Sequence, residues 1–290
     1  NKSCRMLPLE TARLYVNGTK QTSDVGKGLR RDIGRQTARE FYKEKGLLPT
    51  EVFDAVEWDA IELALSDKPR MYKLWYGKQC SGFCGTNSKL VQWGRTDDSR
   101  CPDCNRLGED AGHLMECPNS HRRALLEEQT RKLETWMASH STEPELARLV
   151  AEYLRGGGRR KFARMRVPRE LKELGRTQDR IGWRNFTERK ISKCFRVAQK
   201  RFLKASGASL TVDSWLKALV GKLLGMTHSM WIFRCISKHH RTKGKLVLDT
   251  KAKIFKEIER QLAMGEETVS EEDKWMLEVD TAELRDSTLE

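Results

Sequence analysis

The sequence predicts a mainly α-helical protein with a small N-terminal β-hairpin and one compact cysteine-rich knuckle. Apolar residues recur at helical spacings over most of the 290 residues, and only seven prolines interrupt them. Three cysteines and a histidine gather between residues 101 and 117. The alternating pattern that is typical of strands is almost absent, so the fold class is all-α with minor β.

The N-terminal elements follow from local patterns. Residues 14–22 predict a hairpin, because Asn17-Gly18 between two short runs favours a tight type I′ turn. Apolar residues at helical spacing then predict helices over 29–45, 50–65 and 70–80.

Two more helices are predicted in the middle of the chain. Residues 126–137 carry apolar side chains at helical spacing, and residues 146–154 follow the i, i+3, i+4, i+7, i+8 stripe closely. Pro144 suits the start of the second helix, and Gly156-Gly157-Gly158 stops it. Residues 156–170 then read as a basic linker.

The C-terminal part predicts two long helices and two shorter ones. Residues 186–202 combine a Phe-rich face with a heavily basic opposite face, and residues 215–231 form a helix that Thr211 can cap. A further helix is predicted over 254–262. The run Ser270-Glu271-Glu272-Asp273 resembles a capping box for the last one.

These elements divide the chain into four segments. They are an N-terminal hairpin and helix (1–49), helices with the knuckle (50–140), a helix with a Gly/Arg linker (141–175), and a C-terminal helical domain with an acidic tail (176–290).

Charge is spread unevenly along the chain. The formal net charge is +14, with +15 carried by residues 176–262 and −8 by residues 263–290. A long basic stretch before an acidic tail favours a polyanion-binding surface with which the tail competes. The alternative is a set of well-solvated helix faces.

The eight cysteines do not resemble a secreted disulfide framework, because those outside the cluster are scattered through helix-like sequence. No signal peptide and no long apolar span is visible. We therefore expect an intracellular protein without a membrane partner. The chain begins with Asn1, so we expect a fragment of a longer protein.

The cluster predicts a zinc site. Cys101 and Cys104 are separated by two residues, and His113 and Cys117 are four apart, so a short helix would place the latter two on one face. Thiolates and imidazole suit zinc, and four protein ligands leave no position for a substrate water. We therefore expect a structural Zn²⁺ in a CCHC zinc finger.

Other ligands stay open as alternatives. His121 lies close enough in sequence to be a rival ligand. Cys80 and Cys84 are also four apart, but no partners for a second metal are evident, and we expect them to be packed in the core.

Residues 70–121 contain a recognisable series of motifs: Leu74-Trp75-Tyr76-Gly77, Cys101-Pro102-Asp103-Cys104, Glu109, His113-Leu114 and Cys117-Pro118. This series resembles the zinc-binding region that follows the polymerase domain in many non-long-terminal-repeat retrotransposon proteins. Some family members space the His and last Cys differently, which leaves ligand geometry open but not ligand identity.

Three further stretches are similar to reverse-transcriptase-associated reading frames of unicellular algae and other protists. They are residues 178–183, 231–234 and 241–244. Together the resemblances imply the C-terminal part of a retroelement polyprotein that handles RNA or target DNA, with an upstream reverse transcriptase domain in the same polypeptide.

No enzyme is expected within this segment. Asp97-Asp98 lies between polar residues instead of on a hairpin between apolar strands, so we interpret it as a loop. No phosphate-binding loop, dinucleotide fingerprint or small-molecule site is visible.

Residues 155–169, which contain no acidic residue, and the basic face of the helix after Arg176 supply the candidates for contact with a nucleic-acid backbone. Phe162 could in addition stack on an unpaired base. The candidates are Arg155, Arg159, Arg160, Lys161, Phe162, Arg164, Arg166, Arg184, Arg189, Lys193, Arg196 and Lys200. The leading hypothesis is a zinc-stabilised nucleic-acid-binding region; the alternatives are a protein-interaction scaffold and a retroelement nuclease.

Overall fold

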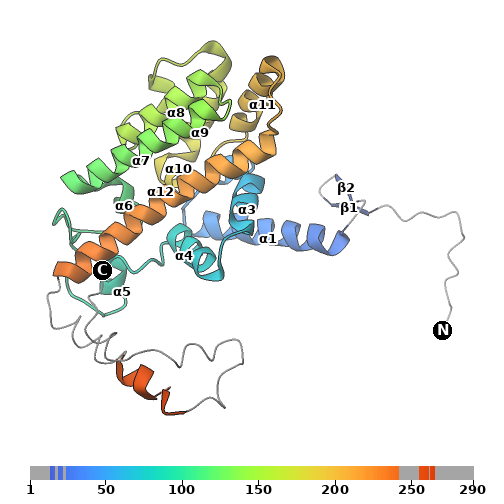
Figure 1. Ribbon diagram of the computed structural model, residues 1–290. Helices are drawn as coiled ribbons and strands as arrows, with labels where there is room; N and C mark the ends of the chain where they lie inside the picture. The colour runs from blue at the N-terminus through green and yellow to red at the C-terminus, as the bar shows by residue number, and fades with distance from the viewer. Residues whose placement is uncertain (1–13, 17–18, 22–23, 242–254, 261, 265–290) are drawn as a thin grey trace, which may run out of the picture.

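A computed structural model describes residues 14–16, 19–21, 24–241, 255–260 and 262–264 of the chain. The prediction of a mainly helical protein is confirmed (Figure 1). Strands β1 (Leu14–Val16) and β2 (Thr19–Gln21) pair antiparallel, with Tyr15 opposite Lys20. The predicted turn at Asn17-Gly18 lies outside the described residues.

Helix α1 (Val25–Glu44) covers the first predicted helix. The prediction of one helix over 50–65 is wrong, because the chain forms α2 (Thr50–Phe53) and α3 (Trp58–Ser66) with a break between them. In that break Val56 forms a bridge with Ser192, and Glu57 N donates to Ile191 O at 2.8 Å. Pairing with a segment far along the chain therefore replaces local helical hydrogen bonds.

The next helices lead into the cysteine cluster. Helix α4 (Arg70–Ser81) lies where it was predicted and ends at Gly82, whose φ of 72° is the left-handed conformation that favours glycine. Helix α5 (Asn87–Gln92) and the four-residue α6 (His113–Glu116) flank a loop that contains Cys101 and Cys104.

Helices α7 (Ser120–Ser139) and α8 (Pro144–Gly156) pack side by side (Figure 1). The Asn119 side chain caps α7 by accepting from the backbone N–H groups of His121 and Arg122. Proline at its first position and left-handed Gly157 delimit α8, as its sequence predicted.

The prediction of a linker over 156–170 is wrong, because this segment is folded. It contains the 3₁₀ turns η1 (Phe162–Arg164) and η2 (Arg169–Leu171). The carboxylate of Asp179 accepts from the backbone N–H groups of Phe162 and Ala163, both at 2.8 Å.

The prediction of one helix over 186–202 is also wrong. The chain forms α9 (Lys172–Ile181), α10 (Trp183–Thr187) and α11 (Cys194–Ser206). The breaks fall at Gly182 and near Arg189, which have φ angles of 88° and 71°. A helix cannot continue through positive φ.

The 30-residue helix α12 (Val212–Arg241) runs diagonally through the molecule and contacts α3, α6, α7, α10 and α11 (Figure 1). Thr211 Oγ1 accepts from Ser214 N at 3.2 Å, so the predicted cap is confirmed. The largest cluster of buried apolar side chains extends from Tyr42 to Met230 and draws on nearly all of these elements.

The rest of the C-terminal predictions are only partly covered. Residues 255–260 are helical, within the predicted helix, whereas the predicted capping box at Ser270 and most of the acidic tail lie outside the described residues. In the described parts of the chain, no helix combines the length and the apolar character that crossing a bilayer requires.

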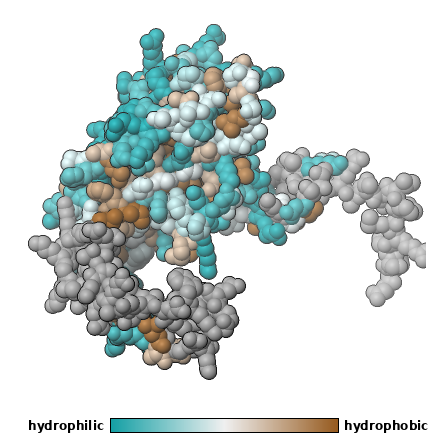
Figure 2. All heavy atoms as spheres, viewed as in Figure 1, coloured by the Kyte–Doolittle hydropathy of each residue, from teal (hydrophilic) through white to brown (hydrophobic). Residues whose placement is uncertain are grey.

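Hydrophilic side chains cover much of the face in Figure 2, especially over α7 and α8. An apolar patch lies toward the C-terminal half of α12, where Ile232 and Ile236 are exposed.

Replacing Gly158 tests the packing of the 157–162 segment. A Cβ atom at this position would lie 2.2 Å from Trp183 Cγ, and the φ angle is 73°. We expect Gly158→Ala to lower the free energy of unfolding by about 2–4 kcal/mol in urea titrations. Gly221→Ala in α12 is the matched control, because its Cβ meets nothing within 4 Å, and it should stabilise the protein by roughly 0.5 kcal/mol or more. Equal changes in unfolding free energy for the two substitutions would contradict the close packing of Gly158 against Trp183.

Candidate metal centre

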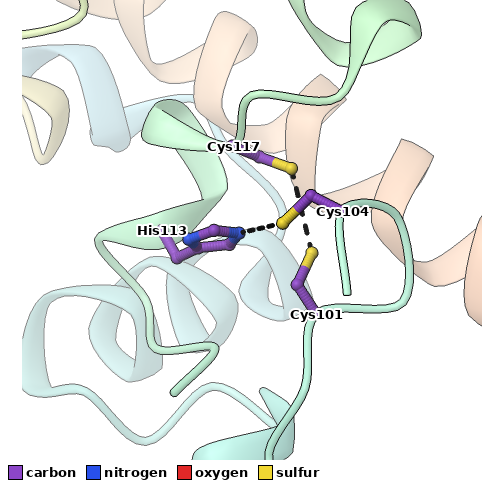
Figure 3. Close-up of side chains that lie close together, drawn as sticks. All are labelled: Cys101, Cys104, His113 and Cys117. Atoms are coloured by element: carbon purple, nitrogen blue, oxygen red, sulfur yellow. Dashed lines mark hydrogen bonds between the residues drawn. The ribbon is translucent and has the colours of Figure 1, made fainter. Parts of the chain in front are cut away.

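Cys101, Cys104, His113 and Cys117 point toward one another (Figure 3), and their possible ligand atoms all lie within 4.8 Å of each other. The Sγ atoms of Cys101 and Cys117 are 3.8 Å apart, and Sγ of Cys104 is 3.3 Å from Nε2 of His113. Cys101 and Cys117 are buried, whereas Cys104 and His113 are half-buried. The four side chains lie close enough to hold a metal ion.

These distances match the edges of a tetrahedron around one ion. With metal–sulfur bonds of about 2.3 Å and metal–nitrogen bonds of about 2.0 Å, tetrahedral angles place two sulfurs about 3.8 Å apart and a sulfur and a nitrogen about 3.5 Å apart. The two short separations in the cluster agree with these values. The remaining separations lie within 4.8 Å, so the four side chains are close enough to coordinate one ion.

The turn that contains Cys101 and Cys104 is fixed by its own backbone. Asn105 N donates to Cys101 O at 2.9 Å, and Cys101 N donates to Arg106 O at 2.8 Å. Asn105 takes a φ of 61°, a conformation that asparagine tolerates better than most residues. On the other side, Asp110 Oδ1 accepts from His113 N at 2.8 Å and fixes the start of α6.

A buried ion pair connects the turn to α7. Arg122 Nε donates to the Asp103 carboxylate at 2.6 Å, and both side chains are almost completely buried. Asn119, the cap of α7, also donates through Nδ2 to Asp103 O at 3.0 Å. The cysteine turn is therefore held against the helix that follows Cys117.

A second buried ion pair connects the cluster loop to α12. Arg234 donates to both oxygens of Glu109, from Nε at 2.9 Å and from Nη2 at 2.6 Å. Glu109 Oε2 also accepts from Asn87 N at 2.8 Å, and Glu109 is completely buried. This bidentate pair joins residues 125 positions apart in sequence.

The thiols of the cluster interact electrostatically. The hydrogen bond with Cys117 holds the pKa of the Cys101 thiol well below its usual value, and the same interaction raises the pKa of Cys117. Metal binding at these sulfurs would require their thiolate forms, so it would release protons.

Among the described residues, this is the group of histidine, cysteine and carboxylate side chains that is close enough to hold a metal. His121 lies outside it, exposed at the start of α7. Cys80 and Cys84 are buried, and burial raises the pKa of Cys80 to about 11 and of Cys84 to about 12. Both remain protonated near neutral pH, which agrees with a packing role.

The structure divides the predicted nucleic-acid contacts into three groups. Half-buried or exposed side chains that are paired with carboxylates are Arg155, Arg160, Arg184 and Arg196. Exposed side chains without a carboxylate partner in the described residues are Arg159, Lys161, Arg164, Arg166, Lys193 and Lys200. Phe162 and Arg189 are completely buried.

The prediction that Phe162 is available to stack on a base is wrong. Its ring lies 4.1 Å from that of Tyr153 and belongs to the main core cluster. Burying an aromatic ring in the core stabilises the protein more than leaving it exposed on a linker. The 156–170 segment is also folded instead of being a linker.

The prediction that Arg189 contacts nucleic acid is wrong as well. Its side chain donates to Thr227 Oγ1 on α12, and burial lowers the pKa of its guanidinium to about 9. The adjacent Lys190 is also buried, where its ammonium pairs with Glu188 and lies 4.7 Å from the centre of the Tyr42 ring. These charges belong to the interior, although the sequence places them in a basic run.

The interpretation of Asp97-Asp98 as a loop is confirmed. Both residues are outside regular secondary structure, and Asp98 Oδ1 accepts from Arg100 N at 2.9 Å.

The sequence missed the two ion pairs that hold the cluster. Asp103 and Glu109 resembled exposed loop residues, and their arginine partners lie 19 and 125 residues away. Gln178 and Asp179, quoted for a resemblance, hold neighbouring segments by accepting backbone N–H groups of Ser192 and Phe162.

No family model, no curated protein and no solved structure matches the chain.

Removing the metal should destabilise the protein, because the ion would join the Cys101–Cys104 turn to His113 on α6 and to Cys117. We expect a strong chelator to lower the melting temperature, and Cys104→Ser to abolish stoichiometric metal in elemental analysis. Cys194→Ser is the control, because Cys194 lies in α11, outside the cluster. Folded protein that holds no metal and melts unchanged with chelator would refute the site.

Breaking the second ion pair should affect both stability and the metal. We expect Arg234→Met to cost about 3–5 kcal/mol of unfolding free energy, because it leaves the Glu109 carboxylate buried and unpaired. The double variant Glu109→Gln/Arg234→Met should recover part of this loss. If Arg234→Met has the same unfolding free energy and the same metal affinity as the wild type, the loop does not depend on its ion pair with α12.

Proposed function

We propose that the cluster holds a structural zinc ion. The support is the donor set: three thiolates with one imidazole suit zinc better than oxygen-preferring cations, and four protein ligands complete its tetrahedral coordination. Such an ion stabilises the 101–117 loop instead of activating water. The buried Asp103 and Glu109 ion pairs connect that loop to α7 and α12.

We further propose that the protein binds RNA or DNA through backbone contacts. The observation that carries this proposal is the set of exposed basic side chains over 159–180 that form no ion pair among the described residues, in particular Arg159, Lys161, Arg164 and Arg166. Cations without internal partners remain available for phosphates, and binding would release condensed counterions. Such contacts position a nucleic acid without reading its sequence.

The resemblance to retrotransposon proteins supplies the context for this proposal. In that context the chain is the C-terminal part of a polyprotein, an upstream reverse transcriptase domain is its partner, and it positions RNA or target DNA. The Glu109–Arg234 pair joins two of the stretches on which the resemblances rest, residues 101–118 and 231–234. A single fold therefore accommodates both stretches.

A scaffold that binds another protein is the second candidate. The observation in its favour is exposed apolar surface, including Met71 and Leu74 on α4 and Ile236 on α12. Salt dependence separates the two functions, because apolar contacts weaken little when salt is added.

Binding to labelled oligonucleotides over a range of salt concentrations tests the proposal. We expect the logarithm of the binding constant to fall linearly with the logarithm of the salt concentration. The slope should correspond to several phosphate contacts. The triple variant Lys161→Gln/Arg164→Gln/Arg166→Gln should weaken binding on the order of tenfold or more, similarly for all sequences. Arg30→Gln/Lys43→Gln/Arg131→Gln removes the same charge from exposed sites on α1 and α7 and serves as the control. An equal loss in both variants would point to net charge alone, and no binding at all would leave the scaffold.

A further inference from the structure

A hollow of about 410 Å³ opens directly beside the cysteine cluster. Its lining comes from the knuckle, the start of α7 and the turn after α8, and consists of Arg106, His113, Glu116, Pro118, Arg123, Gly157 and Arg159. The volume falls within the roughly 300–1,000 Å³ that is typical of small-ligand sites. Only Arg159 was a candidate from the sequence, because the three arginines come from separate parts of the chain.

The charge of this hollow favours an anion. Three arginines line it, with one acidic residue, Glu116. No ion pair within the described residues neutralises Arg106, Arg123 or Arg159. A zinc ion bound by three thiolates would add one formal negative charge behind His113, and the sum would still be positive.

Two of the arginines are held in place by backbone groups instead of carboxylates. Arg123 Nη2 donates to Arg155 O at 3.1 Å, and Arg159 Nε donates to Gly156 O at 3.2 Å. A guanidinium has five N–H donors, so each of these side chains keeps donors for a ligand. These internal hydrogen bonds already restrict the two arginine side chains, so less side-chain conformational entropy is lost when a ligand binds.

Glycines make this arrangement possible. A Cβ at Gly157 would lie 3.0 Å from Arg123 Nη1, so the absence of a side chain lets the guanidinium lie against the turn. The next residue, Gly158, packs under the Trp183 ring and fixes the backbone from which Arg159 projects. Gly157 and Gly158 resemble a flexible linker in the sequence, but in the structure they pack closely and form one side of the hollow.

We propose that this hollow binds one phosphate group of a nucleic-acid backbone, gripped by Arg106, Arg123 and Arg159 together. The proposal rests on the proposed nucleic-acid binding and names the place and chemistry of one contact. Arginine suits it, because its planar fork matches phosphate oxygens. The zinc site would then serve binding indirectly, since it fixes Arg106 and the α6 wall of the hollow.

The test uses the full chain with its metal and a labelled single-stranded oligonucleotide of mixed sequence. The variants are Arg106→Gln, Arg159→Gln and both together, with Arg131→Gln on α7 as the control of equal charge change. Arg131 is exposed and lies outside the hollow. Metal content and melting temperature are measured for each variant, and Lys replaces Gln where a variant loses metal.

We expect each single variant to lose affinity on the order of tenfold, and Arg131→Gln to lose much less. Because the arginines share one phosphate, the salt slope should fall by no more than about 0.7, even in the double variant. A fall of about 1.4 in the double variant would mean two independent phosphate contacts and would overturn the shared site. Variants that bind like Arg131→Gln would overturn it too. If the wild type does not bind, the proposed function itself fails, which is a separate outcome.

Discussion

The bidentate pair between Glu109 and Arg234 is the constraint on which the arrangement of this protein depends. The 101–117 loop is attached to the helical body partly by apolar packing, because Leu114 and Met115 are buried and α6 packs against α12, and partly by polar contacts. A buried carboxylate is tolerated only when it is paired and hydrogen-bonded, and Glu109 meets this condition through Arg234 and the backbone of Asn87. Helix α12, which contacts five other helices, thereby fixes the loop as well.

Cations serve two purposes in this chain. Arg122, Arg189, Lys190 and Arg234 are buried and hold elements together, whereas Arg159, Lys161, Arg164 and Arg166 face solvent without carboxylate partners in the described residues. The count of 55 Lys and Arg residues therefore overstates the binding surface, because some of these side chains are used internally. Of the four exposed side chains, Arg159 lines the hollow beside the cysteine cluster, and there the proposed nucleic-acid contact and the candidate metal site meet.

Local patterns predicted the elements that depend on local physics. The sequence predicted α8 from its apolar stripe, its N-terminal proline and its C-terminal glycine. It also predicted α4 and the Thr211 cap of α12. Patterns failed where distant segments compete for the backbone. The helix predicted over 50–65 breaks where Val56 pairs with Ser192, and the linker predicted over 156–170 is folded because Asp179 binds its amides. Phe162 is buried for the same reason.

The sequence by itself determined the helical class and the four candidate metal ligands, because helix periodicity and ligand spacing act over a few residues. Only the tertiary structure decided which charges are buried, which are paired and which are free. An arginine in a basic run has the same local sequence whether it faces water or Thr227, and the difference lies in residues 38 positions away. The hollow beside the cluster is likewise invisible in sequence, since its arginines converge only when α7, α8 and the 101–117 loop have packed together.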